Sequence, residues 1–490
     1  MIEKYYSGVI EQIYNRIGKE TRNIVMANYS NDFSIENLEV IRRYQSNEDN
    51  VFFAYSEFSY NTLVGAYEPF LDIICNMHRR FIGGSFDEFQ KECGVYYLHR
   101  QVLNSYYETG ECFREETVLL NEVAYEQRRM TMAIADMLKK LSEVKPLMIV
   151  INRFQMASKS SIETIKYLID NPCANIGIVL GVNAIVKGTD STVEVWDRIV
   201  ESLEDRSAIY YIGSAGPLKN NVKTTNDDEL YITMNFEQSI QEASNIMEFL
   251  DFEQARRGCR IIEHKLKFED AWIDEKSLRR FYMVYARTSV LLGEMSKAIE
   301  LTNEYKALIP ENDSEHYLSL YYFMKGTCYM YQGKLEKAGN SAKSAYDYAV
   351  LAEDDTLIFK AELLSVMIKM SGWYNIFFCV QDIPVSDEII EKLIKHGYRN
   401  HLAHIYIYAY DNSRDVVKQS FYDESLLKHF TKGLELAKEI GNEQLVYDAY
   451  QKTIMLASTS GLNEIAFLYV IRTYEFMKGH GNIYVARVLT

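Results

Sequence analysis

The stretch PLMIVINRFQMASKSSIETIKYL (146–168) decides the fold class of the first half of the chain. It begins with an uninterrupted apolar run, PLMIVI (146–151), which is typical of a strand buried on both faces of a parallel sheet. The residues SSIETIKYLI that follow place apolar side chains at helical spacing. A buried strand that leads into an amphipathic helix predicts one unit of an α/β sheet domain.

Further apolar runs of strand length occur on both sides of this stretch. The segments between them, including FSIENLEVIRRYQ and the long region that ends near Lys145, have helical periodicity. We therefore expect a parallel sheet flanked by helices over residues 1–215, followed by a linker over 216–235. The additional strand candidates are NIVMA (23–27), VFFAY (51–55), IGIVLGV (176–182) and AIYYIG (208–213).

From Phe236 onward the sequence shows no further strand run, and an internal repeat appears instead. Small residues recur where two helices must approach closely, and a glycine recurs where the chain must turn between them. This spacing is that of tetratricopeptide repeats, so we predict an all-α solenoid of such repeats over 236–490. The matching residues are Tyr282, Ala286, Gly293, Ala298, Tyr305 and Pro310 in one copy, Tyr322, Gly326, Tyr329, Gly333, Ala338 and Ala345 in the next, and Tyr450, Gly461 and Ala466 in a weaker third.

Composition limits the classes of function. The 490 residues are 48% hydrophobic, which is enough for real cores, and 53 basic against 69 acidic residues give a formal charge of −16. Such a surface repels a phosphate backbone, so we expect no direct nucleic-acid binding. The seven cysteines contain no CxxC pair, which predicts reduced thiols and no zinc site. No apolar run is long enough to span a bilayer, so we expect a cytoplasmic protein without membrane contact.

With both halves in view, the chain resembles the STAND class of signal-transduction ATPases, specifically the ATPase-plus-tetratricopeptide core of large LuxR-type transcriptional regulators. The likeness lies in the apolar pattern of residues 146–168 and in a Tyr-x-Pro-Phe segment upstream. It implies a P-loop-NTPase-like sheet domain with a helical repeat domain, and a role in signalling or transcriptional control. The residues that carry it are Ala157, Ser161, Ile162, Glu163 and Leu168 in the first segment, and Tyr67, Pro69 and Phe70 in the second.

The departures from that family concern its chemistry. The phosphate-binding loop needs glycines and a lysine, yet NYSNDFSIENL (28–38) contains neither. The acids that would hold Mg²⁺ are replaced by Asn152 and Arg153, and Asn183 stands where the family tends to place a sensor arginine. We therefore predict an inactive domain with no catalytic residue, cofactor or metal, and we expect Arg153 to pair with a nearby carboxylate. The degenerate nucleotide-site positions are Asn28, Ser34, Asn152, Arg153 and Asn183.

The predicted function is that of a non-catalytic regulator, a pseudo-ATPase platform that carries a partner-binding solenoid. In tetratricopeptide arrays certain positions of the first helix face the concave groove. A groove with two arginines and several apolar residues suits an acidic or amphipathic peptide, or a small effector, although an ordinary solvated face would show the same pattern. By this register the groove residues are Arg280, Met283, Arg287, Phe323, Thr327 and Met330.

Two alternatives remain open. The protein could act as a nucleotide-binding switch or slow ATPase through unconventional residues, or as a structural adaptor with a constitutive partner. Three histidines in KHGYRNHLAHIY lack a further ligand at a suitable spacing, so we interpret them as helix-packing residues rather than metal ligands. The unconventional residues are Ser30, Ser34, Asn152 and Arg153, and the histidines are His396, His401 and His404.

Overall fold

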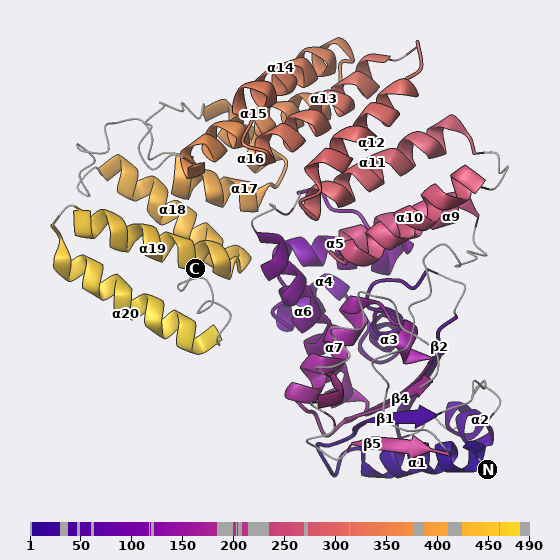
Figure 1. The fold of residues 1–490 in the computed structure, drawn as a ribbon. Coiled ribbons are helices and arrows are strands. Elements are labelled where there is room, and N and C mark those ends of the chain that lie inside the picture. The colour runs from indigo at the N-terminus through magenta and orange to yellow at the C-terminus, as the bar shows by residue number, and fades with distance from the viewer. Residues whose placement is uncertain are drawn as a thin grey trace. The chain divides into compact units, whose positions relative to one another are not determined.

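The computed structural model shows a mostly helical chain with one small sheet, organised in two compact units (Figure 1). Unit 1 comprises Met1–Arg114 and Leu119–Leu292, and unit 2 comprises Glu115–Val118 and Gly293–Thr490. The structure describes residues 2–29, 38–46, 50–59, 63–116, 118, 122–183, 199–201, 203, 208–213, 235–268, 273–312, 314–375, 387–409, 424–459 and 461–480.

The sheet of unit 1 has five parallel strands in the order β2-β3-β4-β1-β5. All five strands predicted from the apolar runs are present, which confirms the parallel sheet. Both β3 and β4 are buried along their full length, as expected for strands covered on both faces. The bounds are β1 Ile24–Tyr29, β2 Phe52–Glu57, β3 Leu147–Asn152, β4 Ile176–Asn183 and β5 Ile209–Ile212.

Helices cover both faces of the sheet. On one face lie α1 (Ile2–Arg16) and α2 (Glu39–Ser46), and on the other lie α3 (Phe70–Met77), α6 (Val123–Val144) and α7 (Lys159–Asp170) (Figure 1). Helix α1 packs directly on β1, β4 and β5 through an apolar stripe. The remaining elements of this part are η1 His78–Ile82, α4 Phe86–Glu92, α5 Tyr97–Thr109 and η3 Phe154–Met156.

The strand order fixes where this sheet could hold a ligand. Strand β1 leads to β2 at the far edge of the sheet, whereas β4 leads in the opposite direction, past β1, to β5. Ligands of open parallel sheets bind outside the carboxyl ends of the strands, at the point where the connections diverge in this way. The ends of β1, β3 and β4 are therefore the place to look for a nucleotide.

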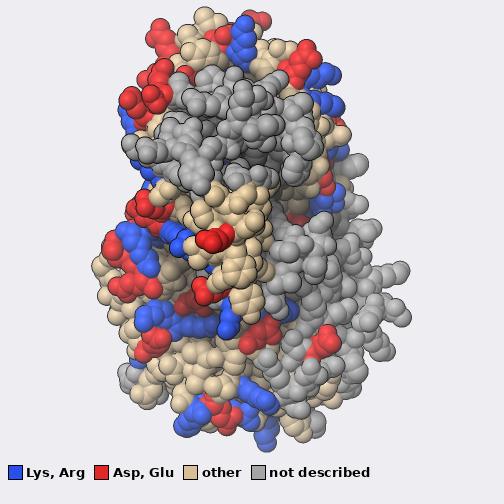
Figure 2. Space-filling view, turned by 90° about the vertical axis from the view of Figure 1, so that its left-hand side faces the viewer, with Lys and Arg blue, Asp and Glu red and all other residues tan. Residues whose placement is uncertain are grey.

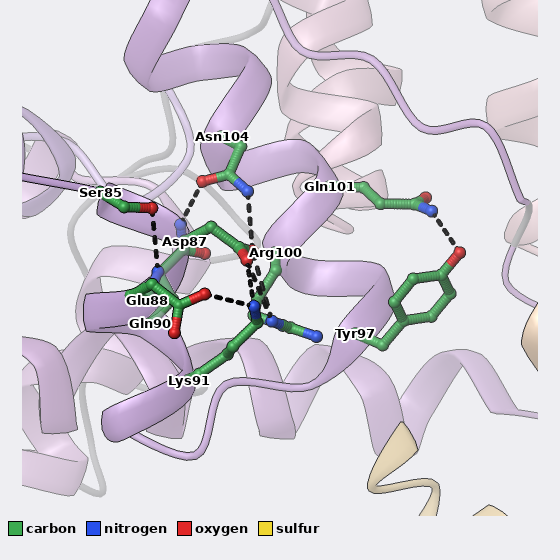
Figure 3. Close-up of polar contacts among 9 residues, drawn as sticks. All are labelled: Ser85, Asp87, Glu88, Gln90, Lys91, Tyr97, Arg100, Gln101 and Asn104. Carbon is green, nitrogen blue, oxygen red and sulfur yellow. Dashed lines mark hydrogen bonds and ion pairs between the residues drawn. The ribbon is translucent and has the colours of Figure 1, made fainter. Parts of the chain in front are cut away.

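A polar network joins α4 to α5 (Figure 3). Asp87 lies 2.8 Å from Nζ of Lys91 and 3.3 Å from Nη1 of Arg100, and Nδ2 of Asn104 donates to it at 3.1 Å. Partial burial raises the pKa of Asp87, but the hydrogen bonds from Lys91 and Asn104 and the charge of Arg100 outweigh it and hold the pKa below its ordinary value. Because these groups satisfy one another, the network stabilises the helical hairpin.

Helices α9 (Phe236–Glu248), α10 (Phe252–Phe268) and α11 (Glu275–Leu291) belong to unit 1. Asp251 accepts the backbone N–H of Ser160 at 3.0 Å, and Nε2 of Gln254 donates to the carbonyl of Val64 at 3.0 Å. Both contacts attach this helical segment to the sheet part. Helix α9 begins at Phe236 behind a capping box. The predicted linker lies outside the described residues except for Asn235, so the domain boundary proposed there stays a prediction.

Unit 2 is an array of antiparallel helix pairs, of which α13 with α14, α14 with α15 and α19 with α20 pack against each other. This confirms the predicted helical repeats as an architecture. The bounds are α12 Met295–Ala307, α13 Ser314–Tyr331, α14 Leu335–Leu351, α15 Asp355–Asn375, α16 Asp387–Lys395, α17 Arg399–His404, η5 Ile405–Ala409, α18 Glu424–Ile440, α19 Glu443–Thr459 and α20 Asn463–His480.

The second predicted repeat shows why its small residues are needed. Gly333 turns the chain between α13 and α14 at φ +71°, a backbone conformation that favours glycine. A Cβ on Gly326 would lie 3.0 Å from Leu364 on α15 and 3.4 Å from Ser341 on α14. Because glycine has no Cβ, α13 can approach both of these helices closely. Ala338 is fully buried. The first predicted copy instead spans the division between the units, which falls between Leu292 and Gly293.

Candidate functional site

The carboxyl ends of the central strands are filled by side chains of the protein itself. Tyr29 ends β1, Asn152 ends β3, and both are fully buried. The hydroxyl of Tyr29 donates to Oδ1 of Asn152 at 2.6 Å. This bond links the two strands across β4, at the carboxyl ends of the strands, where open parallel sheets bind their ligands.

A second tyrosine and a glycine complete this strand-end plug, defined here as Tyr6, Tyr29, Asn152 and Gly181. Tyr6 reaches in from α1, and its ring centroid lies 6.2 Å from that of Tyr29. A Cβ on Gly181 would lie 2.8 Å from Oδ1 of Asn152 and would collide with the hydroxyl of Tyr6. Burial, and then the neighbouring Tyr29, raise the pKa of Tyr6 well above its ordinary value, so its hydroxyl stays neutral.

Arg153 is paired within unit 1. Its Nη1 lies 3.0 Å from Oε1 of Glu57, the last residue of β2, and it also donates to the carbonyl of Phe58 at 3.4 Å. Arg153 adopts a left-handed backbone conformation, φ 55°, at the turn that leaves β3. The pair confirms the expectation that this arginine finds a nearby carboxylate.

The other predicted nucleotide-site positions divide into two groups. Asn28 and Asn183 are both 1% exposed, and the backbone N–H of Asn183 donates to Gln155 at 3.3 Å. Ser30 and Ser34 lie outside the described residues. The described part of the strand-end edge therefore offers buried amides and phenols together with one ion pair, a set without the exposed carboxylates that magnesium prefers.

Unit 1 also contains an acidic cavity of about 390 Å³, between the start of α3 and helix α9. Glu68, Asp72 and Glu242 contribute its three carboxyl groups. Glu68 accepts the backbone N–H of Gly65 at 2.9 Å, and Asp72 accepts the hydroxyl of Tyr106 at 3.0 Å. The remaining lining residues are Leu63, Ala66, Leu71, Gly110, Asn245 and Phe249.

The cavity raises the pKa of two of its carboxyl groups. Burial, followed by the charges of Glu68 and Asp72, raises the pKa of Glu242 to about 7. Burial also raises the pKa of Glu68, although the hydrogen bond from Gly65 opposes this. Because the pKa of Glu242 is higher in the folded chain than in the unfolded chain, the folded state binds more protons at intermediate pH. Stability is then lost as the pH rises from about 4.5 through about 7.

Replacing Glu242 with glutamine removes the loss of stability that ionisation of this buried carboxyl causes. We expect Glu242→Gln to stabilise the protein by about 1–3 kcal/mol at pH 8, where the native carboxyl is ionised, and to leave stability almost unchanged near pH 4. Urea denaturation at both pH values measures the difference, with exposed Glu237→Gln on the same helix as control. Equal effects of Glu242→Gln at both pH values would contradict the assigned role of the carboxyl.

In unit 2 a buried carboxylate joins distant parts of the sequence. Glu116 is fully buried and accepts the backbone N–H groups of Asn400 at 3.1 Å and His401 at 2.5 Å, and Nδ1 of His401 donates to it at 2.6 Å. The hydroxyl of Tyr398 donates to the carbonyl of Glu115 at 2.6 Å. Together these contacts fix Glu115 and Glu116 to the start of α17.

The histidines of this region take packing and hydrogen-bonding positions. His396 stacks on Phe359 with ring centroids 4.5 Å apart, His401 contacts Glu116, and His404 is buried. Among the described residues, no three or more His, Cys, Asp or Glu side chains gather as they would around a metal ion.

The six predicted groove residues are divided between the two units. On α11 of unit 1, Arg287 pairs with Glu248 at 2.8 Å, and Arg280 donates to Gln241, while Met283 is half-buried. On α13 of unit 2, Phe323 and Thr327 are half-buried, whereas Met330 is 3% exposed and packs in a core cluster with Ala338, Ala342, Leu364 and Ile368. A role of these residues in partner binding stays a prediction.

Charge and hydropathy add two observations. On the face shown in Figure 2, basic and acidic side chains of the described residues are interspersed, so a phosphate backbone would meet both signs there. None of the helices in the described ranges combines the length and the apolar character that crossing a membrane requires.

Comparison with known proteins gives weak likenesses. No protein-family profile and no curated protein match the chain. A Rap protein complexed with competence and sporulation factor is 12% identical, with 84% of this chain and 98% of that chain covered and a TM-score of 0.35. A STAND protein with a tetratricopeptide repeat sensor from Pyrococcus horikoshii is 12% identical, with 93% and 81% covered and a TM-score of 0.40. At these values neither likeness carries an argument about this chain.

Sequence patterns identified part of these sites. Asn152 and Arg153 are visible because they follow a recognisable strand. Tyr6 and Tyr29 were missed as site residues because each also fits an ordinary buried position, Tyr6 on the apolar stripe of its helix. Glu242 lies 174 residues after Glu68 along the chain, so no local signal connects the two.

Proposed function

We propose that this chain is a non-catalytic regulator, in which a P-loop-ATPase-like sheet unit without nucleotide chemistry accompanies a helical repeat unit that binds a protein or peptide partner. The observation that carries the first half is the buried hydrogen bond between Tyr29 and Asn152. It occupies the strand ends with neutral groups, where phosphoryl transfer needs carboxylates to hold Mg²⁺ and orient water.

Electrostatics supports the same proposal. Arg153 lies where a phosphate could be bound, but it pairs with Glu57 at 3.0 Å. A phosphate would compete with that carboxylate for the guanidinium, in a site where both side chains are mostly buried, at 21% and 16% exposure. Leaving a buried charge uncompensated is strongly destabilising. The pair therefore opposes the alternative of a nucleotide switch that uses Arg153.

The architecture of unit 2 supports the second part of the proposal, that the helical repeats bind a partner. Repeat arrays bury each helix pair against its neighbours and leave an extended face for a partner. In unit 2, α13, α14 and α15 pack in this manner, and the half-buried Phe323 and Thr327 lie on α13. We propose that the partner is a protein or peptide that meets such half-buried side chains, as solenoids of this architecture are suited to do.

A phosphate-release assay tests the absence of chemistry. We expect the full chain with Mg·ATP to release phosphate at the background rate of the buffer, because Asn152 and Arg153 stand at the end of β3, where phosphoryl transfer needs acids that hold Mg²⁺. The matched variant is Arg153→Ala, which removes the candidate phosphate ligand of the alternative function. Hydrolysis above background that falls in Arg153→Ala would refute the proposal and establish the slow ATPase.

A further inference from the structure

Helix α20 carries apolar residues on two opposite sides. One side packs on α19: Ala466 and Thr473 are buried, and the rings of Tyr469 and Phe476 approach Tyr450 at 5.7 and 6.0 Å. A helix that is apolar all round normally has both sides covered. The pairing with α19 accounts for only one of them.

The other side is exposed and has the spacing of a coiled-coil seam. Phe467, Ile471 and Tyr474 are 66%, 40% and 66% exposed. With Glu464 before them and Lys478 after them they follow each other at intervals of three, four, three and four residues, which keeps all five on one face of a helix. A contiguous exposed apolar face of this kind marks an interaction site. This apolar seam therefore needs an occupant.

We propose that the seam of α20, residues 464–478, is covered by the α20 of a second copy of this chain in an antiparallel two-fold arrangement. The charges select both the occupant and its direction. In the antiparallel pair, centred on Ile471, Glu464 of each copy lies opposite Lys478 of the other, while the apolar side chains meet in the middle. A parallel pair would instead place like charges together at both ends.

The arrangement also meets the requirements of a closed dimer. A two-fold axis makes every contact occur twice, so the two Glu–Lys pairs are formed by the same patch on both copies. The α19–α20 hairpins of the two copies then form a four-helix bundle, in which the inner side of each α20 keeps its contacts with α19. The dimer does not depend on what the sheet unit binds.

A charge-swap experiment on the full chain distinguishes this dimer from other occupants. Sedimentation equilibrium is expected to show a concentration-dependent dimer for the wild type. Glu464→Lys and Lys478→Glu, each alone, replace two attractive pairs with two repulsive ones and should weaken dimerisation by about tenfold. The double variant Glu464→Lys/Lys478→Glu restores opposite charges and should recover the wild-type dimer constant.

Phe467→Ser removes an apolar side chain from the seam and should abolish the dimer. It should leave the circular dichroism spectrum unchanged, because Phe467 is exposed in the single chain and does not contribute to its core. Two results would overturn the proposal. A wild-type chain that stays monomeric at about 100 μM would mean that another segment or another protein covers the seam. A dimer that survives both single charge variants and Phe467→Ser would place the interface elsewhere.

Discussion

Unit 2 is expected to lose about 3–5 kcal/mol of stability when Glu116 is replaced by alanine, because three donors then remain buried without an acceptor. The donors are the backbone N–H groups of Asn400 and His401 and Nδ1 of His401. The carboxylate is fully buried, so water cannot replace it without opening the packing around α17. Urea denaturation measures the loss, and amide exchange at the start of α17 locates it.

The neighbouring residue gives a matched control. Glu115 is exposed, and it contributes only its backbone carbonyl, to Tyr398, among the described contacts of this segment. Glu115→Ala makes the same change of charge and should alter stability by less than about 0.5 kcal/mol. If Glu116→Ala costs no more than Glu115→Ala, the buried carboxylate does not hold the segment in unit 2.

The second large effect is expected at Gly181 in β4. An added methyl group would collide with the hydroxyl of Tyr6 and lie 2.8 Å from Oδ1 of Asn152. Overpacking of a tight core, with loss of the Tyr29–Asn152 hydrogen bond, should destabilise the full chain by about 2–4 kcal/mol in urea denaturation. The result would show that the strand-end plug is closely packed.

Two companion variants make this test specific. Gly177→Ala places the same methyl group in the same strand but away from the plug, 2.8 Å from Cδ1 of Ile17 and 3.0 Å from Cγ2 of Ile13, and should cost about 1–3 kcal/mol whether or not the Tyr6 hydroxyl is present. Tyr6→Phe removes the nearest colliding atom, so Gly181→Ala should cost less in that background. Equal costs for Gly181→Ala with and without the Tyr6 hydroxyl would contradict the contact.

The architecture follows from local patterns. Five apolar runs predicted five strands, because a strand covered on both faces must be apolar throughout. Gly333 and Ala338 revealed a helix pair, because tight turns and close helix contacts restrict residue type. Both signals lie within a few dozen residues of sequence, which is why they can be read without a structure.

Sites built across the sequence could not be predicted in this way. Glu116 meets His401 across 285 residues, and neither residue belongs to a local motif that points to the other. Likewise the sequence shows that Asn152 is not an acid, but not that Tyr29 bonds to it. The predicted groove has a related weakness: it combined two neighbouring copies of the repeat, whereas α11 and α13 belong to different units. Only packing reveals which side chains are already engaged.

Calorimetric titration with Mg·ATP and Mg·ADP tests the central claim, that the strand ends are filled by the protein itself, most directly. We predict only heats of dilution, and no rise in melting temperature at about 5 mM nucleotide, because binding to the folded state alone would raise it. Saturable binding with a Kd below about 1 mM, weakened in Arg153→Ala, would contradict the claim and show that the sheet unit still holds a nucleotide.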